Sequence, residues 1–177
     1  MAFSSRTSRH EYLLAALEIP VYRQTVPRLE AELRRARRYE RPLSMLVLGA
    51  EPIRRKVHLS WGGEAAVPLT AEVEPVLFAF LGGFLRSSLR ETDLLASVPE
   101  SLRYVAFLPE VDGDGAEEAA SRLRADFLEL ASVHLRAGIA EFPRDGFTIA
   151  DLFQIASGES NARRWEIPSL KQDGSNA

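Results

Sequence analysis

The segment 70–89 constrains the fold more than any other, because its pattern predicts a long helix that is apolar nearly all round. The apolar residues are Val73, Val76, Leu77, Phe78, Phe80, Leu81, Phe84 and Leu85. Such a helix has to be covered on several sides, so it belongs in the interior of a domain. Gly82 and Gly83 lie within it, and two glycines destabilise a helix by about 2 kcal/mol relative to alanine. We therefore expect another backbone to cross this helix closely at the glycine pair.

The composition fits one globular domain. The chain has 177 residues, of which 46% are hydrophobic and 27% charged, which is enough for one core and too short for two ordinary domains. It has no cysteine, which excludes disulfides, cysteine-ligated metals and thiol catalysis. A net charge of −3 argues against a generally basic nucleic-acid binder. No apolar run approaches the ~20 residues of a membrane span, and the polar stretch 1–10 does not resemble a secretory signal. We expect a cytoplasmic protein that neither binds nucleic acid nor inserts into a membrane.

The charge is unevenly distributed along the chain. Residues 1–60 have a net charge of +6, and residues 61–177 have a net charge of −9. The basic excess lies mostly on one predicted helix, at Arg34, Arg35, Arg37, Arg38 and Arg41. A solvated helix face explains such a run most simply. An anion-binding or partner-binding surface is the alternative.

The remaining segments alternate between helical and extended patterns. They predict helices at 10–17, 25–38, 114–131 and 148–156, a short helical piece at 160–165, strands at 43–48, 94–98, 103–108 and 133–142, and a hairpin turn at 99–102. Thr25, Asp114 and Thr148 are the expected N-caps, and Asp151 completes a capping box with Thr148. The segment 49–67 contains Pro and Gly and is expected to be irregular.

This order of elements predicts an α/β fold. Crossovers together with one hairpin give a mixed central β-sheet wrapped by α-helices. We expect the domain to span 25–166. The segment 1–24 would be an N-terminal extension, flexible or forming a short helix, and 167–177 would be a C-terminal tail.

Four segments, in the correct order, resemble diguanylate cyclase GGDEF domains. They are 30–49 (EAELRRARRYERPLSMLVLG), 85–93 (LRSSLRETD), 104–109 (YVAFLP) and 135–152 (LRAGIAEFPRDGFTIADL). The first resembles the opening helix and strand of the family, and the last resembles its characteristic strand, turn and capped helix. The resemblance covers about 25–165 and implies a nucleotidyl-cyclase palm-like fold.

The same resemblance implies that the catalytic residues are lost. The family condenses two GTP molecules into cyclic di-GMP with the help of carboxylate-bound divalent metals. The carboxylate that ends the first strand falls near Gly49, with Glu51 close by. The Gly-Gly-Asp-Glu-Phe signature is replaced by Glu100, Ser101, Leu102, Arg103 and Tyr104. Arg103 thus stands where the family has a metal-binding glutamate. We expect a GGDEF-like domain that is degenerate, is not an enzyme, and holds neither a catalytic metal nor a cofactor.

One element of the family is retained, the Arg-x-x-Asp motif of its product-binding site. Arg90 and Asp93 match it. In the family a second arginine, from the helix after the signature, often completes this site across a dimer, and Arg122 or Arg124 occupies the corresponding region. An arginine fork can donate to guanine O6 and N7, and an aspartate can accept from the guanine N1–H and amino groups. The structural alternative is that Arg90 interacts with the C-terminal end of its helix and pairs with Asp93.

Two functions follow as hypotheses. In the first, the domain is a cyclic di-GMP receptor whose ligand state changes its contact with a partner protein or promotes a homodimer. In the second, it is a dimerisation or protein-interaction scaffold that binds no nucleotide, with the arginine-rich helix as one contact surface.

Overall fold

The computed structural model describes residues 9–51, 54–58, 64–68 and 73–162. Its helices are α1 (Arg9–Leu17), α2 (Tyr22–Tyr39), α3 (Val73–Ser88), α4 (Gly113–Ala131) and α5 (Ile149–Ala162), with a 3-10 turn η1 (Pro99–Ser101). Its strands are β1 (Leu43–Ala50), β2 (Arg54–His58), β3 (Glu64–Pro68), β4 (Leu94–Val98), β5 (Arg103–Pro109) and β6 (Leu135–Phe142). Among the described residues, no helix is long and apolar enough to cross a membrane.

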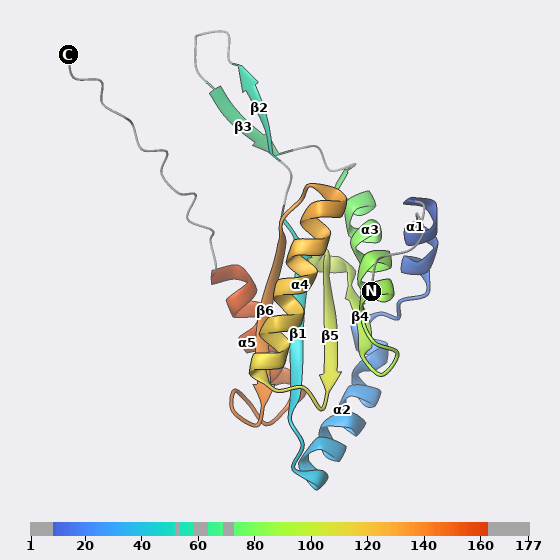
Figure 1. Ribbon diagram of the computed structural model, residues 1–177, viewed down its shortest axis with the longest axis vertical. Helices are drawn as coiled ribbons and strands as arrows, with labels where there is room; N and C mark the ends of the chain where they lie inside the picture. The colour runs from blue at the N-terminus through green and yellow to red at the C-terminus, as the bar shows by residue number, and fades with distance from the viewer. Residues whose placement is uncertain (1–8, 52–53, 59–63, 69–72, 163–177) are drawn as a thin grey trace, which may run out of the picture.

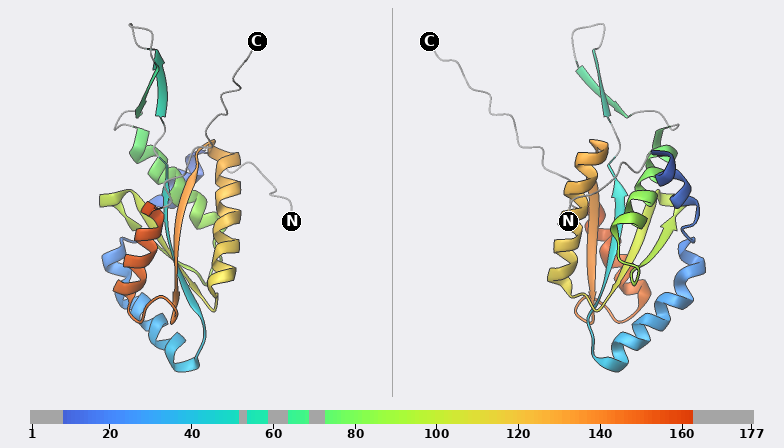
Figure 2. Two further views of the ribbon diagram at one scale, coloured as in Figure 1. Left: turned by 90° about the vertical axis from the view of Figure 1, so that its left-hand side faces the viewer. Right: turned by 45° about the vertical axis from the view of Figure 1, so that its right-hand side comes forward.

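Four strands form a central sheet in the order β4-β5-β1-β6. Helices cover both of its faces (Figures 1 and 2), with α1, α3 and α4 on one side and α2 and α5 on the other. The expected palm-like α/β architecture is confirmed. The strand directions are more uniform than expected for a mixed sheet, because all three ladders are antiparallel. The one parallel pairing within the described residues is the isolated bridge between Val21 and Ser97.

Strand β1 runs through the middle of the molecule, which explains why the segment 43–48 is apolar at every position except Ser44. Its side chains alternate between the two faces of the sheet. Leu46 and Leu48 pack with α3 and α4, whereas Met45 and Val47 pack with α2 and α5. All four are 0% exposed. A strand buried on both faces is apolar at nearly every position, and its one buried polar side chain, Ser44, donates to the Val111 carbonyl at 2.9 Å.

The glycine pair of α3 permits two close approaches, one of which is the expected backbone crossing. A Cβ on Gly83 would lie 2.5 Å from the backbone Cα of Tyr12 in α1. A Cβ on Gly82 would lie 2.6 Å from Cζ of Tyr104 and 3.1 Å from Ile19. Gly83 therefore lets the α1 backbone cross α3, and Gly82 makes room for the Tyr104 ring. Tyr12 and Ile19 belong to the core, although both precede residue 25, where the domain was expected to begin.

Two expected N-caps are wrong. Helix α2 begins at Tyr22, before Thr25, whose hydroxyl donates instead to the Val21 carbonyl at 3.2 Å. The Tyr22 ring stacks on Phe153 with centroids 5.0 Å apart, so a tertiary contact extends the helix beyond its sequence signal. Helix α4 is capped by Asp112 and not by Asp114, since the Asp112 carboxylate accepts from the Gly115 amide at 2.9 Å.

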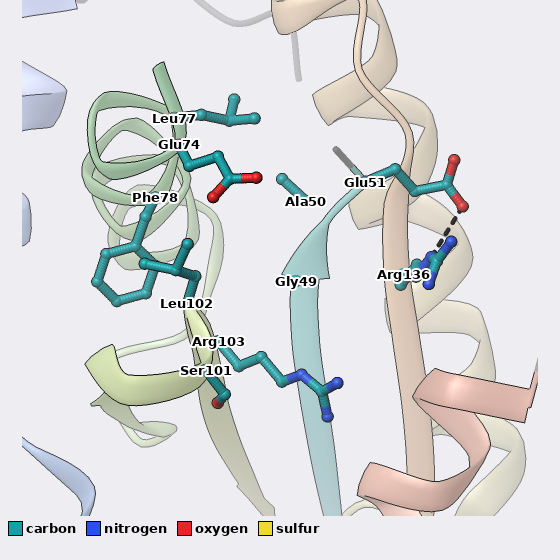
Figure 3. Close-up of a pocket in the computed structure, with 10 residues that line it drawn as sticks. All are labelled: Gly49, Ala50, Glu51, Glu74, Leu77, Phe78, Ser101, Leu102, Arg103 and Arg136. Atoms are coloured by element: carbon teal, nitrogen blue, oxygen red, sulfur yellow. Dashed lines mark hydrogen bonds and ion pairs between the residues drawn. The ribbon is translucent and has the colours of Figure 1, made fainter. Parts of the chain in front are cut away.

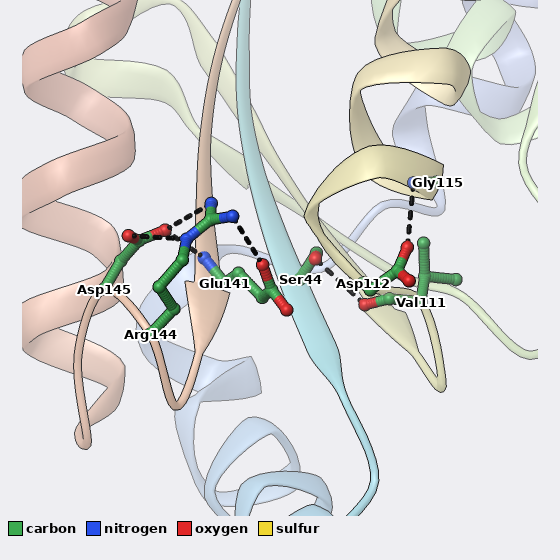
Figure 4. Close-up of polar contacts among 7 residues, drawn as sticks. All are labelled: Ser44, Val111, Asp112, Gly115, Glu141, Arg144 and Asp145. Carbon is green, nitrogen blue, oxygen red and sulfur yellow. Dashed lines mark hydrogen bonds and ion pairs between the residues drawn. The ribbon is translucent and has the colours of Figure 1, made fainter.

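Ion pairs and hydrogen bonds among Glu141, Arg144 and Asp145 hold the turn after β6 (Figure 4). The Arg144 guanidinium lies 2.9 Å from Glu141 and donates to Asp145 at 3.1 Å. This ion pair holds the pKa of Asp145 below its usual value. The expected capping box is confirmed: the Thr148 amide donates to Asp151 at 3.0 Å, and the Asp151 amide donates to the Thr148 hydroxyl at 3.1 Å.

Two further expectations need correction. The segment 49–67 was expected to be irregular, but it contains β2 and β3, which pair as a separate two-stranded sheet. Helix α5 continues to Ala162 without the break expected before residue 160. The rest of the short helical piece and the C-terminal tail lie outside the described residues.

Candidate functional site

The Arg-x-x-Asp motif forms a tight turn between α3 and β4. The Arg90 amide donates to Oδ2 of Asp93 at 2.9 Å, and the Asp93 amide donates to the Arg90 carbonyl at 3.1 Å. Asp93 is only 7% exposed, while Arg90 is exposed. The carboxylate therefore fixes the backbone of Arg90, and the Arg90 guanidinium makes no hydrogen bond or ion pair with the part of the chain that the structure describes.

Helix α4 brings a second arginine to this turn. Burial raises the pKa of Asp93, while the Arg90 amide and the positive charges of Arg90 and Arg122 oppose that shift. Arg122 is exposed and lies close enough to Asp93 for its charge to act on the carboxyl group. The turn thus gathers one buried carboxylate and two cations from separate elements.

Arg124, the other candidate, has a structural role in this chain. It donates to Glu117 at 3.0 Å and to the Ala137 carbonyl at 3.1 Å. The first contact lies within α4, and the second ties α4 to β6. Between the two arginines, only Arg122 contributes to the electrostatics of Asp93.

The segment 100–104, which was expected to be a degenerate signature, spans the turn between β4 and β5 and the first two residues of β5. Glu100 and Ser101 belong to η1, and Leu102 follows in the left-handed region with a φ of 52°. That backbone conformation favours glycine. Tyr104 is buried, and its hydroxyl donates to the Phe78 carbonyl of α3 at 3.0 Å. Burial also raises the pKa of Tyr104, so this residue acts as part of the core.

A cavity of about 230 Å³ lies beside this turn, at the ends of β1 and β6 and the start of α3 (Figure 3). Arg103 extends across the end of β1, and its Cγ lies 3.5 Å from the position of a Cβ on Gly49. Glu51 pairs with Arg136 of β6 at 2.9 Å. Glu74 points from α3 toward Ala50. Over the described residues, no three histidine, aspartate or glutamate side chains gather to hold a metal ion.

Arg136 and Glu74 are cavity residues that the sequence reasoning missed. Arg136 stands directly opposite Gly49 in the β1–β6 ladder. Aligning the two strands antiparallel through their apolar runs would have placed it there. Glu74 lies in the first turn of α3, but nothing in its local sequence separates it from an ordinary solvated glutamate.

Most arginines of the basic run 34–41 have partners, some within α2 and some elsewhere in the domain. Arg34 and Arg35 lie 3.9 Å from Glu30 and Glu32 respectively. Arg41 pairs with Glu110, and Arg37 donates to the Phe147 carbonyl at 2.8 Å. This network agrees with a solvated helix face better than with a surface held open for anions.

Comparison with known proteins identifies the fold. No protein-family model matches the chain, and no curated protein sequence matches it. The GGDEF domain of PA1120 (TpbB or YfiN) from Pseudomonas aeruginosa is similar in structure, with a TM-score of 0.64, 20% identity and coverage of 82% of this chain and 84% of that one. The coiled coil and GGDEF domain of DgcB from Caulobacter crescentus, in complex with c-di-GMP, has a TM-score of 0.61, 10% identity and coverage of 83% and 77%.

A third similar structure is the diguanylate cyclase SiaD from Pseudomonas aeruginosa in complex with its activator SiaC. It has a TM-score of 0.60 and 18% identity, and the match covers 81% of this chain and 54% of that one. The chain therefore has the fold of GGDEF diguanylate cyclase domains, in agreement with the resemblance in its sequence.

Proposed function

We propose that this protein is a catalytically inactive GGDEF-fold module that binds cyclic di-GMP at the α3–β4 turn. The observation that carries the proposal is the gathering of Arg90, Asp93 and Arg122 at one turn, with Asp93 buried. A change of contact with a partner protein, or formation of a homodimer, would then report the ligand state.

The chemistry of the turn suits a guanine edge. Oδ2 of Asp93 is used by the Arg90 amide, which leaves Oδ1 to accept from the N1–H or amino group of a guanine. The planar guanidinium groups of Arg90 and Arg122 can donate to O6 and N7, stack on a base or bind a phosphate. Burial raises the pKa of Asp93 because the ionised carboxylate has lost contact with water. Hydrogen-bond donors of a bound guanine would replace that water and stabilise the ionised form.

The cavity beside the degenerate signature supports the loss of activity. The first-strand position holds Gly49, and the adjacent signature position holds Arg103, whose stem lies over that glycine. A guanidinium at this place repels a divalent cation, whereas the cyclase reaction needs carboxylates to bind metal. Glu51 is already paired with Arg136.

The comparisons support the choice of ligand and the idea of a partner. DgcB was solved in complex with c-di-GMP, and SiaD in complex with an activator protein. Both share the fold of this chain, although their identities of 10% and 18% carry no functional residue across. The assignment therefore depends on the turn itself.

Calorimetric titration with cyclic di-GMP tests the proposal. We expect low-micromolar binding, roughly −8 kcal/mol, in the original chain and in Arg28→Ala, which removes an exposed arginine of α2 that is not among the charges acting on Asp93. Arg90→Ala and Arg122→Ala should each lose binding, and Arg122→Lys should recover it only in part because lysine lacks the planar fork. Incubation with GTP and Mg²⁺ should yield no cyclic di-GMP.

The absence of heat with cyclic di-GMP would reject the receptor and leave the nucleotide-independent scaffold as the remaining function. Binding that survives in both alanine variants would place the ligand elsewhere. Metal-dependent turnover of GTP would contradict the proposed loss of catalysis.

A further inference from the structure

The β2–β3 hairpin is the one paired element of the described chain that stands outside the central sheet. Its two strands form a separate sheet, with Arg55 opposite Val67 and Val57 opposite Ala65. All three views show it projecting beyond the body of the domain (Figures 1 and 2). It is inserted between Glu51 and Glu74, both of which line the cavity. We refer to β2 and β3 together as the arm.

The arm has free strand edges. In a two-stranded sheet each strand pairs on one side only, so β2 and β3 each present an outer edge that no described strand covers. The amides and carbonyls along such an edge can accept a further strand. An isolated two-stranded hairpin is only marginally stable in water, whereas three strands are more stable. Binding of a third strand would therefore stabilise the arm.

The charges of the two strands differ. Strand β2 carries three cations in succession, Arg54, Arg55 and Lys56, while β3 has a single charged residue, Glu64. Pairing β2 with β2 of a second copy would bring like charges together, which is destabilising. Cationic edge strands resist self-association for this reason. A strand rich in aspartate and glutamate has the complementary charge.

We propose that the arm binds an acidic, extended segment of a partner protein, which adds along the edge of β2 as a third strand. The main-chain hydrogen bonds would provide the pairing, and the run of three cations would select an acidic partner. This interaction does not involve the proposed nucleotide site, because no residue of the arm belongs to the α3–β4 turn.

Fluorescence anisotropy with labelled ten-residue peptides tests the proposal on the whole chain. The probes are an alternating Glu-Val peptide, an alternating Lys-Val peptide and a Glu-Pro peptide, which has the same charge but cannot form a strand. We expect the Glu-Val peptide to bind about tenfold more tightly than either of the others. Arg54 and Lys56 share one face of β2, as the glutamates of the peptide do, and two favourable cross-strand charge pairs would allow this difference. Hydrogen exchange of the 54–58 amides should slow in its presence.

Charge reversal separates the arm from the rest of the surface. The variant R54E/R55E/K56E should lose the Glu-Val peptide and gain the Lys-Val peptide, while its affinity for cyclic di-GMP stays within twofold of the original. The matched control R34E/R35E/R38E makes the same change of charge on α2 and should retain the preference for Glu-Val. A loss in this control equal to that in the arm variant would overturn the assignment to the arm.

Three other outcomes would also overturn the proposal. No binding of the Glu-Val peptide would reject the arm as a docking site. Equal binding of Glu-Pro would show attraction by charge without strand addition. Tighter binding of a single-stranded oligothymidine, lost in R54E/R55E/K56E, would make the arm a nucleic-acid contact.

Discussion

The two ends of α3 differ in the charged groups that surround them. At its N-terminal end, the cavity joins Glu74 to the end of β1, where Gly49 and Arg103 replace carboxylates that the family resemblance leads one to expect. At its C-terminal end, the turn keeps Asp93 buried, with Arg90 and Arg122 acting on it. In the proposed function, this one helix connects a cavity without metal chemistry to a turn that binds a guanine edge. The 16 residues of α3 separate the two places, so each can be altered without changing the residues of the other.

The largest expected effect comes from removing the carboxylate at the C-terminal end. Asp93→Ala deletes both the acceptor for guanine and the hydrogen bond that shapes the Arg90 backbone. We expect cyclic di-GMP affinity to fall by about 100-fold or more, as for a buried anchor of an interface. Calorimetry measures the loss. Asp114→Ala, which removes an exposed carboxylate of α4, should bind as before, and an unchanged affinity in Asp93→Ala would show that the turn is not the site.

The pH dependence of binding follows from the same carboxylate. Burial raises the pKa of Asp93, so Asp93 takes up its proton at a higher pH than an ordinary aspartate. Protonation removes an acceptor, and affinity should fall by about tenfold per pH unit below that raised pKa. The ionised Asp93 also destabilises the fold at neutral pH. This cost declines as the pH falls below the raised pKa, because the folded state then takes up the proton. Titrations from pH 7 downward should show the decline in the original chain and a flatter profile in Asp93→Asn; equal slopes in the two would contradict it.

The N-terminal end of α3 can be tested by restoring carboxylates. A Cβ on Gly49 would meet only ordinary contacts, the nearest being Arg103 at 3.5 Å, so the double variant G49D/R103E should fold. It would place two new carboxylates beside Glu51 and Glu74. We expect it to bind Mn²⁺ with a Kd on the order of 10⁻⁴ to 10⁻³ M, which electron paramagnetic resonance of the free ion detects.

Equal binding of Mn²⁺ by the original chain would show that the N-terminal end of α3 already holds a metal site. Cyclic di-GMP affinity should stay unchanged in the double variant, because the two sites use different residues. Arg38→Glu is the control for a gain of negative charge on an exposed surface, and it should bind no Mn²⁺.

The sequence predicted the features that depend on residues close together in the chain. The β1 run, the Gly82–Gly83 crossing and the Thr148–Asp151 capping box are confirmed because apolar content, backbone space and capping are local signals. The start of α2 was missed because Tyr22 stacks on Phe153, far along the chain. The arm was missed because basic residues and glycines in 49–67 favour irregular structure.

At the site, the motif placed Arg90 and Asp93, but it could not choose between Arg122 and Arg124. Both lie on one helix, two positions apart, and both are ordinary surface arginines in the sequence. Only the packing of α4 shows that Arg124 is engaged by Glu117 and Ala137, while Arg122 acts on Asp93.

The smallest expected effect concerns Tyr104, which lies between the two ends of α3. Tyr104→Phe keeps the ring in the space above Gly82 and removes only the hydrogen bond to the Phe78 carbonyl. We expect a loss of about 1 kcal/mol in the free energy of unfolding, measured by urea denaturation, with cyclic di-GMP binding unchanged. Tyr39→Phe, which alters an exposed tyrosine of α2, should leave stability as it was. A change in ligand affinity in Tyr104→Phe would mean that the degenerate signature and the α3–β4 turn are coupled through α3, and that the two ends are not independent.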